Sequence, residues 1–300
     1  MEDLNLRLAQ LLEVNAVPEK LGVLAAIDAL IEVDHVNPWM SSAVQSLFTH
    51  KDVAVITSAA EVLGKFAHFK GTMLSEFLEQ QLKQSMDLLA DPKNPNPHVA
   101  LLVLRQLAGN APSLFYTHAA QFLDVVWSGL HHKDITIRTA AAAALNQALS
   151  VLSQRDSNST LHTGWYSKLF TKARDLTSKN PDVTHGSLLA LQEILLKVNN
   201  AFMDNKFKPV CDEVIKCYSG NTNKLVRQTI VSLLAVLAHR QPNEFALFYL
   251  TITMNQILLA AFKKENDRSK VLMTIGGIAL AVRSGMIPFL DDIFKHIKAA

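Results

Sequence analysis

The chain has 300 residues, of which 49% are hydrophobic and 19% are charged, and its formal net charge is +2. This apolar content excludes a disordered chain, and the near-neutral charge gives no general case for nucleic-acid binding, which usually needs a concentrated basic face. Two cysteines, Cys211 and Cys217, are too few to staple a chain of this size, so we expect a reducing compartment. The opening MEDLNLRLAQ has no continuous apolar region and predicts no signal peptide.

The apolar stretches have helical spacing from one end of the chain to the other, and no run alternates as a strand would. A recurring pattern places a turn residue before apolar or small residues at +3, +7 and +11. Its anchors, in chain order, are Pro18, Asp52, Asn96, Asp134, Pro181, Asn223 and Glu265. The predicted buried stripes are Leu21/Ala25/Ala29, Val55/Ala59/Leu63, Val99/Val103/Leu107, Ile137/Ala141/Leu145, Thr184/Leu188/Gln192, Val226/Ile230/Leu234 and Arg268/Leu272/Gly276. The pattern at Pro181 and Glu265 is weaker than at the other five anchors.

The anchors run from position 18 to position 265 in six steps, or about 41 residues per step. A second helical pattern lies between most of them, for example over 119–130 and 209–218. Two helices in about 40 residues is the period of HEAT and armadillo repeats. The sequence therefore predicts an all-α solenoid of about seven HEAT-like helical hairpins, an α-α superhelix, forming a single domain over 1–300. Each anchored helix is expected to be the second of its pair.

Small residues predict places where helices approach closely. Five alanines, Ala140–Ala144, lie within the helix that follows Asp134, and Gly276 and Gly277 interrupt an apolar stretch near the end of the chain. Alanine has the highest helix propensity, and small side chains let helix axes approach the short end of the usual 8–10 Å. We expect both segments to pack tightly against neighbouring helices.

One apolar stretch, Phe245–Phe262, is close to the minimum length of a membrane span. No basic flank precedes it, and it is interrupted midway by Thr251, Thr253, Asn255 and Gln256. A helix buried on most sides is the better interpretation, so no transmembrane segment is predicted.

Motifs for catalysis, cofactors and metals do not occur in the sequence. It contains no H-E-x-x-H, no phosphate-binding loop and no set of kinase motifs. The adjacent His131 and His132 are typical of a turn. Cys211 and Cys217 are six residues apart, which does not favour a redox pair. Neighbouring acids, at 212–213 and 291–292, diverge on a helix and do not form a catalytic carboxylate pair. We predict a non-enzymatic chain with no catalytic, cofactor or metal site, and the sequence identifies no partner-binding residue.

Several stretches, in the same order, resemble the N-terminal HEAT region of TOR (target of rapamycin) Ser/Thr protein kinases, of the phosphatidylinositol-3-kinase-related family. They are LVLRQLA at 102–108, QR at 154–155 with WY at 165–166, HG at 185–186, TMNQIL at 253–258 and AVRS at 281–284. The resemblance extends roughly over residues 15–292. The segment 199–209 is short where family members can carry a longer insertion, so no role of such an insertion is transferred.

The resemblance implies a scaffold that positions regulatory partners in growth and nutrient signalling, with the kinase catalytic domain outside this chain. Its implied partners are a Raptor-like regulatory subunit and the second kinase protomer, with no nucleic acid, in the cytoplasm or at endomembrane surfaces through its complex. It also implies a fragment of a longer array. A free-standing HEAT adaptor, such as a transport receptor or a phosphatase scaffold, stays open as an alternative.

Overall fold

The computed structural model describes residues 2–14, 16–33, 35–67, 72–94, 97–155, 160–263 and 265–298. Within these ranges the regular elements are helices, and no strand occurs. The predicted all-α repeat fold is confirmed. Packing divides the chain into two compact units, residues 1–155 and 156–300, and each is described by itself. A single solenoid over 1–300, with its superhelical shape, stays a prediction.

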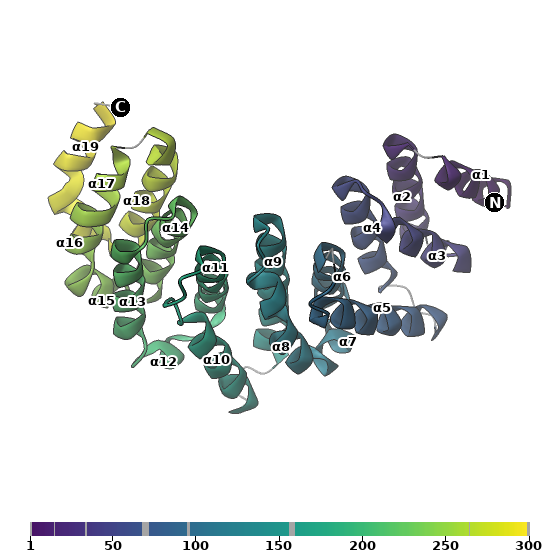
Figure 1. Cartoon of the computed structure of the whole chain (residues 1–300), viewed down its shortest axis with the longest axis horizontal. Coiled ribbons are helices and arrows are strands. Elements are labelled where there is room, and N and C mark those ends of the chain that lie inside the picture. Colours follow the sequence, from purple (N-terminus) through teal and green to yellow (C-terminus); the bar gives the residue numbers. More distant parts are fainter. Residues whose placement is uncertain are drawn as a thin grey trace. The chain divides into compact units, whose positions relative to one another are not determined.

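The first unit stacks its helices in two layers (Figure 1). Its helices are α1 (Glu2–Glu13), α2 (Val17–Glu32), α3 (Pro38–Ser46), α4 (Val53–Phe66), α5 (Thr72–Ala90), α6 (Pro97–Asn110), α7 (Pro112–Thr117), α8 (Ala119–Leu130) and α9 (Ile135–Arg155), with a 3-10 turn, η1, at Leu47–Thr49. In one layer α2, α4, α6 and α9 are successive neighbours. In the other layer α5 packs on α6 and α8, and α8 packs on α9.

The second unit repeats this arrangement, with α11, α14 and α18 as successive neighbours (Figure 1). Its elements are α10 (Thr160–Ala173), α11 (Pro181–Lys197), α12 (Asn200–Met203), α13 (Phe207–Gly220), α14 (Lys224–Arg240), α15 (Pro242–Phe248), α16 (Leu250–Ile252), the π-helical η2 (Thr253–Leu258), α17 (Leu259–Phe262), η3 (Glu265–Asp267), α18 (Arg268–Val282), η4 (Arg283–Phe289) and α19 (Leu290–Lys298). Helix α10 packs on α11, α13 on α14, and both α15 and α17 on α18. The helix after each predicted anchor is therefore the second of its hairpin, as expected.

The turns between paired helices share one capping geometry. Asp52 accepts hydrogen bonds from the amides of Ala54 and Val55, at 2.8 and 3.4 Å, and Asn223 does the same for Leu225 and Val226, at 2.9 and 3.2 Å. Such caps satisfy amide groups that have no partner inside the helix. The anchor residues therefore start these helices, as the pattern predicted. Asn96 lies outside the described residues.

Three of the predicted stripes are fully buried, namely Val55/Ala59/Leu63, Ile137/Ala141/Leu145 and Val226/Ile230/Leu234. Val99 and Gln192 are half-buried, while the other residues of their stripes are buried. The stripe at Pro18 is wrong, because Ala25 and Ala29 are exposed and Val23, Leu24 and Ile27 fill the core instead.

The stripe at Glu265 is also wrong. Residues 265–267 form a separate 3-10 turn, so α18 begins at Arg268 and its register shifts. As a result Leu272 and Gly276 are exposed, while Val271, Ile275 and Ile278 are buried.

Close helix contacts occur at the small residues. Ala141 is fully buried, and a Cβ placed on Gly129 of α8 would lie only 3.0 Å from the Ala141 Cβ. A Cβ on Gly277 would lie 3.1 Å from the Cβ of Ala235 on α14, whereas one on Gly276 meets nothing within 4 Å. The alanine run and Gly277 thus permit close approach, and Gly276 does not take part.

The stretch 245–262 is not one helix buried on most sides. The helix pair 242–248 and 250–262 is bent by 65°, and a π-helical turn follows at Thr253–Leu258. The Tyr249 hydroxyl donates hydrogen bonds to the Asp212 side chain, at 3.0 Å, and to the Lys208 carbonyl, at 3.2 Å, which fixes the bend against α13. At the bend Leu247 and Phe248 are 74% and 51% exposed.

By length and hydropathy alone, the stretches Ile135–Arg155 and Glu265–Lys298 could cross a membrane, and the bent pair could form a third span. In the first stretch 56% of an apolar 18-residue segment is buried inside the protein, and in the second stretch 33% of such a segment is buried. In α9 the apolar side chains form the interface with α6 and α8. The absence of a transmembrane segment stays a prediction.

Candidate functional site

The histidines, cysteines and neighbouring acids singled out in the sequence lie in a turn or on a helix. His131 follows the end of α8, and the ring nitrogen Nδ1 of His132 accepts a hydrogen bond from the Asp134 amide at 3.0 Å, so both belong to a turn as predicted. Cys211 is buried and Cys217 half-buried, and no disulfide joins them. Asp212 accepts a hydrogen bond from Tyr249, whereas Glu213 pairs with Arg174. The two acids therefore diverge, as expected.

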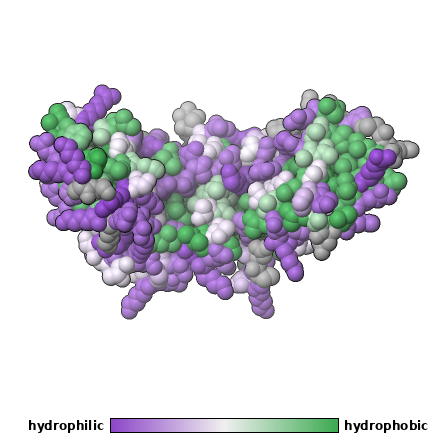
Figure 2. Space-filling model, turned by 90° about the horizontal axis from the view of Figure 1, so that it is seen from above, coloured by the Kyte–Doolittle hydropathy of each residue, from purple (hydrophilic) through white to green (hydrophobic). Residues whose placement is uncertain are grey.

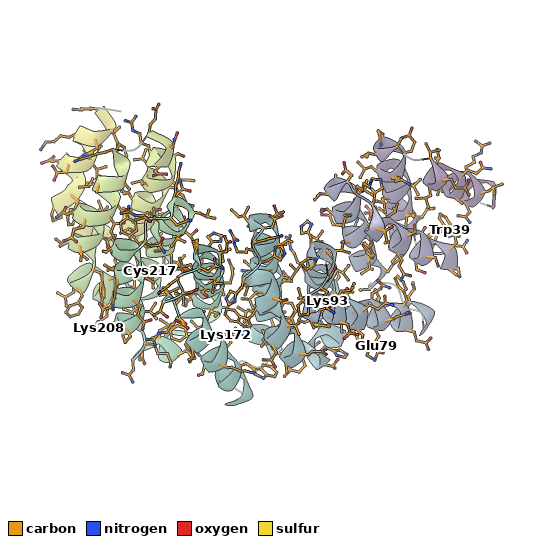
Figure 3. The ribbon with its side chains drawn as sticks, in the orientation of Figure 1. Trp39, Glu79, Lys93, Lys172, Lys208 and Cys217 are labelled. Atoms are coloured by element: carbon orange, nitrogen blue, oxygen red, sulfur yellow. The ribbon has the colours of Figure 1, made fainter. Side chains whose placement is uncertain are left out.

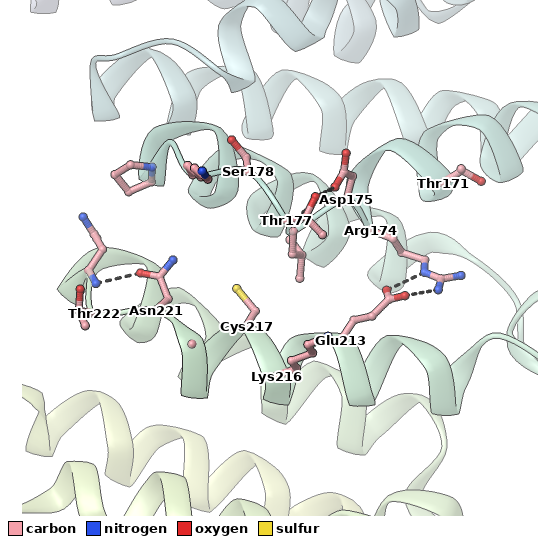
Figure 4. A pocket seen from close by; sticks show the side chains of 15 residues that line it. Thr171, Arg174, Asp175, Thr177, Ser178, Glu213, Lys216, Cys217, Asn221 and Thr222 are labelled. Atoms are coloured by element: carbon pink, nitrogen blue, oxygen red, sulfur yellow. Dashed lines mark hydrogen bonds and ion pairs between the residues drawn. The ribbon is translucent and has the colours of Figure 1, made fainter.

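A groove of about 1110 Å³ lies in the second unit and is here called the turn groove. It lies between the segment 174–180, which joins α10 to α11, and the turn 221–223, which joins α13 to α14 (Figure 4). Cys217 and Lys208 lie toward opposite ends of α13, so the groove follows the C-terminal part of that helix (Figure 3).

Side-chain hydrogen bonds fix the first wall of the turn groove. Asp175 accepts from the Thr177 hydroxyl at 2.6 Å, and the Ser178 hydroxyl accepts from the Asn180 amide at 3.2 Å. Asn180 caps α11 by accepting from the Asp182 amide at 2.9 Å. Because these bonds tie the loop to its own backbone, the wall is preformed.

The second wall uses the same geometry. The Asn221 side chain accepts from the Asn223 amide at 2.8 Å, and Asn223 caps α14. At the far end, Arg174 forms a two-pronged ion pair with Glu213 across the groove, one bond of which, from Nε, measures 2.8 Å (Figure 4). The two hairpins are therefore linked by a charged contact at the groove's end.

The electrostatics of the turn groove suit binding better than proton transfer. Burial raises the pKa of the Cys217 thiol above its ordinary value, so the thiol is a poor nucleophile near neutral pH. Hydrogen bonds from Thr177 lower the pKa of the Asp175 carboxyl, which keeps it an acceptor. Lys179 and Lys216 are exposed at the rim and leave the groove mildly cationic.

A set of exposed apolar side chains, here called the apolar edge, lies on the successive elements α18, η4 and α19. Its side chains are 37–77% exposed and comprise Leu272, Met273, Leu280, Ile287, Leu290, Phe294 and Ile297. On α19 the residues Leu290, Phe294 and Ile297 are spaced as one helical stripe. Figure 2 shows apolar surface among polar surface on the second unit, at the left of the view. Large exposed apolar patches are typical of contact sites for protein or membrane.

No group of three or more His, Cys, Asp or Glu side chains among the described residues could hold a metal ion.

The turn groove and the motif that shapes it were not predicted from the sequence. In this motif, the side chain two residues before the helix cap accepts a hydrogen bond from the backbone amide of the cap residue. The motif occurs at 50–52, 132–134, 178–180 and 221–223. The tripeptide His-Lys-Asp, which occurs at 50–52 and again at 132–134, was the sequence signal for this motif.

The sequence of the chain is similar to part of the sequence of TOR kinases. The chain is 32% identical over 309 aligned residues to the Ser/Thr protein kinase TOR of Arabidopsis thaliana, with 100% of this chain and 12% of that protein covered. It is 29% identical to the kinase tor1 of Schizosaccharomyces pombe, with 99% of this chain and 13% of that protein covered. The resemblance to TOR kinases is confirmed, and the chain spans about an eighth of the length of these relatives.

Among solved structures, a crystal structure of importin beta superimposes with a TM-score of 0.65 and covers 97% of this chain and 39% of its own. At 15% sequence identity this likeness shows the fold alone. A family model of helical repeats, described as "Trm732, C-terminal TPR repeats", matches residues 45–194, which is half of the chain. The chain belongs to this family of helical-repeat proteins.

Proposed function

We propose that this chain is a non-catalytic protein-interaction scaffold, a segment of the helical solenoid of a TOR kinase that positions regulatory partners and supports complex assembly. The observation that carries the proposal is the likeness to TOR kinases over 100% of the chain, in a fold built from stacked hairpins. Arrays of this kind recognise proteins through extended surfaces. Growth and nutrient signalling is the proposed setting.

The proposed partners are a Raptor-like regulatory subunit and the second protomer of the kinase. Two surfaces are suited to them. The turn groove offers preformed hydrogen-bonding loops, and the apolar edge offers an area that resembles the buried core of an interface. The proposed location is the cytoplasm, with the complex docking at endomembrane surfaces.

A free-standing adaptor is the competing function. The importin beta likeness does not favour it, because fold similarity at 15% identity carries no function. Sequencing the full gene separates the two functions, since a scaffold of this type is followed by a kinase domain in the same chain.

The proposed function is tested in the full-length parent kinase by deleting the segment that corresponds to residues 1–300. Partner capture and dimer formation are expected to fall, while phosphorylation of a minimal peptide is retained. Loss of peptide phosphorylation with partner capture intact would overturn the scaffold proposal.

A point variant tests one surface without removing the segment. Phe294→Asp combined with Ile297→Asp disrupts the apolar edge, where the two side chains are 55% and 45% exposed. Lys295→Asp on the same helix is the control, because it changes the charge and leaves the apolar stripe intact. We expect partner capture to fall only in the double variant.

A further inference from the structure

A smaller pocket of about 340 Å³ lies next to the turn groove, and Thr222 lines both. We call it the Arg227 pocket. It lies between the turn that joins α13 to α14 and the turn that leads into α18. A volume near 300 Å³ is at the lower end of the range for ligand sites and suits a single side chain.

Three cationic side chains from two helices line this pocket. Lys224 and Arg227 come from the start of α14, and Lys270 comes from the first turn of α18. Two carboxylates, Glu265 and Asp267, also line it. The carboxylate of Asp267 already has a partner, because it accepts a hydrogen bond from the side-chain amide of Gln228. The lining therefore has one more positive than negative charge.

Arg227 is arranged to receive an acceptor. Its guanidinium lies 4.2 Å from the centre of the Tyr218 ring, which holds the group in place by stacking. Its Nε atom is buried and has no hydrogen-bond partner. Buried donors are nearly always paired, so an unpaired donor on a residue that lines a pocket indicates a missing acceptor.

In another repeat, the equivalent position holds an arginine, Arg138, whose contacts serve only the fold. Arg138 lies four residues after its helix cap, Asp134, as Arg227 lies four residues after Asn223. Its guanidinium donates to the carbonyls of His132 and Lys133, at 2.7 and 3.0 Å, and the side chain is only 2% exposed. Arg227 is half-buried and its Nε has no hydrogen-bond partner, so stabilising its own turn does not account for its arrangement.

The surroundings of Lys270 agree with a partly dehydrated pocket. Burial lowers the pKa of this lysine, and Asp267 opposes the shift. An ammonium group with fewer waters gains more from an anionic partner than one in open solvent.

We propose that the Arg227 pocket binds the oxyanion of one acidic side chain, a phosphate or a carboxylate, on a peptide segment of a protein partner. Guanidinium groups bind both anions through two parallel hydrogen bonds, and the lysines add charge on either side. This inference rests on the proposed scaffold function and specifies the partner's chemistry at one position.

The test uses three fluorescein-labelled peptides of one sequence, with phosphoserine, aspartate or serine at the central position. Fluorescence anisotropy measures their binding to the 300-residue chain. We expect the phosphoserine or the aspartate peptide to bind at least tenfold tighter than the serine peptide. The tighter of the two identifies the source of the oxyanion.

Arg227→Gln is expected to weaken that binding about tenfold, and Arg227→Lys is expected to restore it only in part, because lysine keeps the charge and loses the planar fork. Lys216→Gln is the matched control, since Lys216 lies on the neighbouring α13 and lines the turn groove instead. Thermal unfolding verifies that each variant is folded, and Lys270→Gln provides a second variant of the pocket.

Three results would overturn the inference: equal affinity for all three peptides, an equal loss in Lys216→Gln and Arg227→Gln, or no binding of any peptide at millimolar concentration. Partner capture by the full-length kinase separates this failure from failure of the scaffold. If the kinase carrying Arg227→Gln captures its partners normally and the peptides do not bind, the pocket inference is wrong and the scaffold proposal stands.

Discussion

The replacement Ala141→Leu tests the packing that holds α8 against α9. Ala141 is fully buried. A Cβ added to Gly129 would lie 3.0 Å from the Ala141 Cβ and 3.1 Å from the Leu101 Cδ1. No space for another methyl group exists between these helices, so three added carbons must displace a helix or adopt strained rotamers. Overpacking costs about 1–3 kcal/mol, and this site belongs in the upper half of that range.

A loss of about 2–3 kcal/mol corresponds to a fall in Tm of about 4–12 °C for a unit of this size. Thermal unfolding by circular dichroism measures it. The matched control is Ala25→Leu, the same replacement at an exposed position of α2, which should change stability by no more than about 0.5 kcal/mol. An unchanged Tm in Ala141→Leu, or an equal fall in both variants, would refute the packing argument.

Four further variants are tested with the same assay. Gly276→Ala should stabilise by about 0.5–1 kcal/mol because its site is open, whereas Gly277→Leu should destabilise by about 1–3 kcal/mol against α14. Arg283→Gly should raise stability by about 1 kcal/mol, because Arg283 has φ of 50°. Glu213→Gln should cost at most about 1 kcal/mol at low salt, since Arg174 and Glu213 are 30% and 39% exposed, and the loss should shrink in concentrated salt.

The repeat pattern was predictable because it depends on local chemistry. A polar cap followed by apolar residues at +3, +7 and +11 specifies where a helix starts and which face is buried. Where a cap such as Asp52, Asp134 or Asn223 was present, the predicted stripe was correct. At Pro18 no side chain caps the helix, so the register had no reference point and the stripe was wrong.

Other features depended on contacts between segments far apart in the sequence. The bend at Tyr249 is fixed by Asp212 and Lys208, which lie about 40 positions earlier, so the apolar run 245–262 looked like one helix. The turn groove requires that Arg174 reach Glu213 of the next hairpin, which no local spacing indicates. Surface features of this kind come from stacking, and single-repeat patterns do not contain them.

The position four residues after the helix cap shows how an array can gain function without losing its fold. Ile56, Arg138 and Thr184 occupy it as buried residues, whereas Arg227 is half-buried beside a pocket. If Arg138 serves the fold and Arg227 serves binding, then Arg138→Met should cost about 1–3 kcal/mol, because buried carbonyls of its turn lose their donor.

Arg227→Met should cost less than about 1 kcal/mol, because the buried Nε has no hydrogen bond to lose and the stacking contact with Tyr218 contributes little. The two replacements are chemically identical and occupy equivalent positions of two repeats, so helix propensity and side-chain size cancel between them. Urea unfolding of both variants gives the comparison. Equal losses of stability would mean that Arg227 is a structural residue, and the proposed division of roles between Arg138 and Arg227 would be wrong.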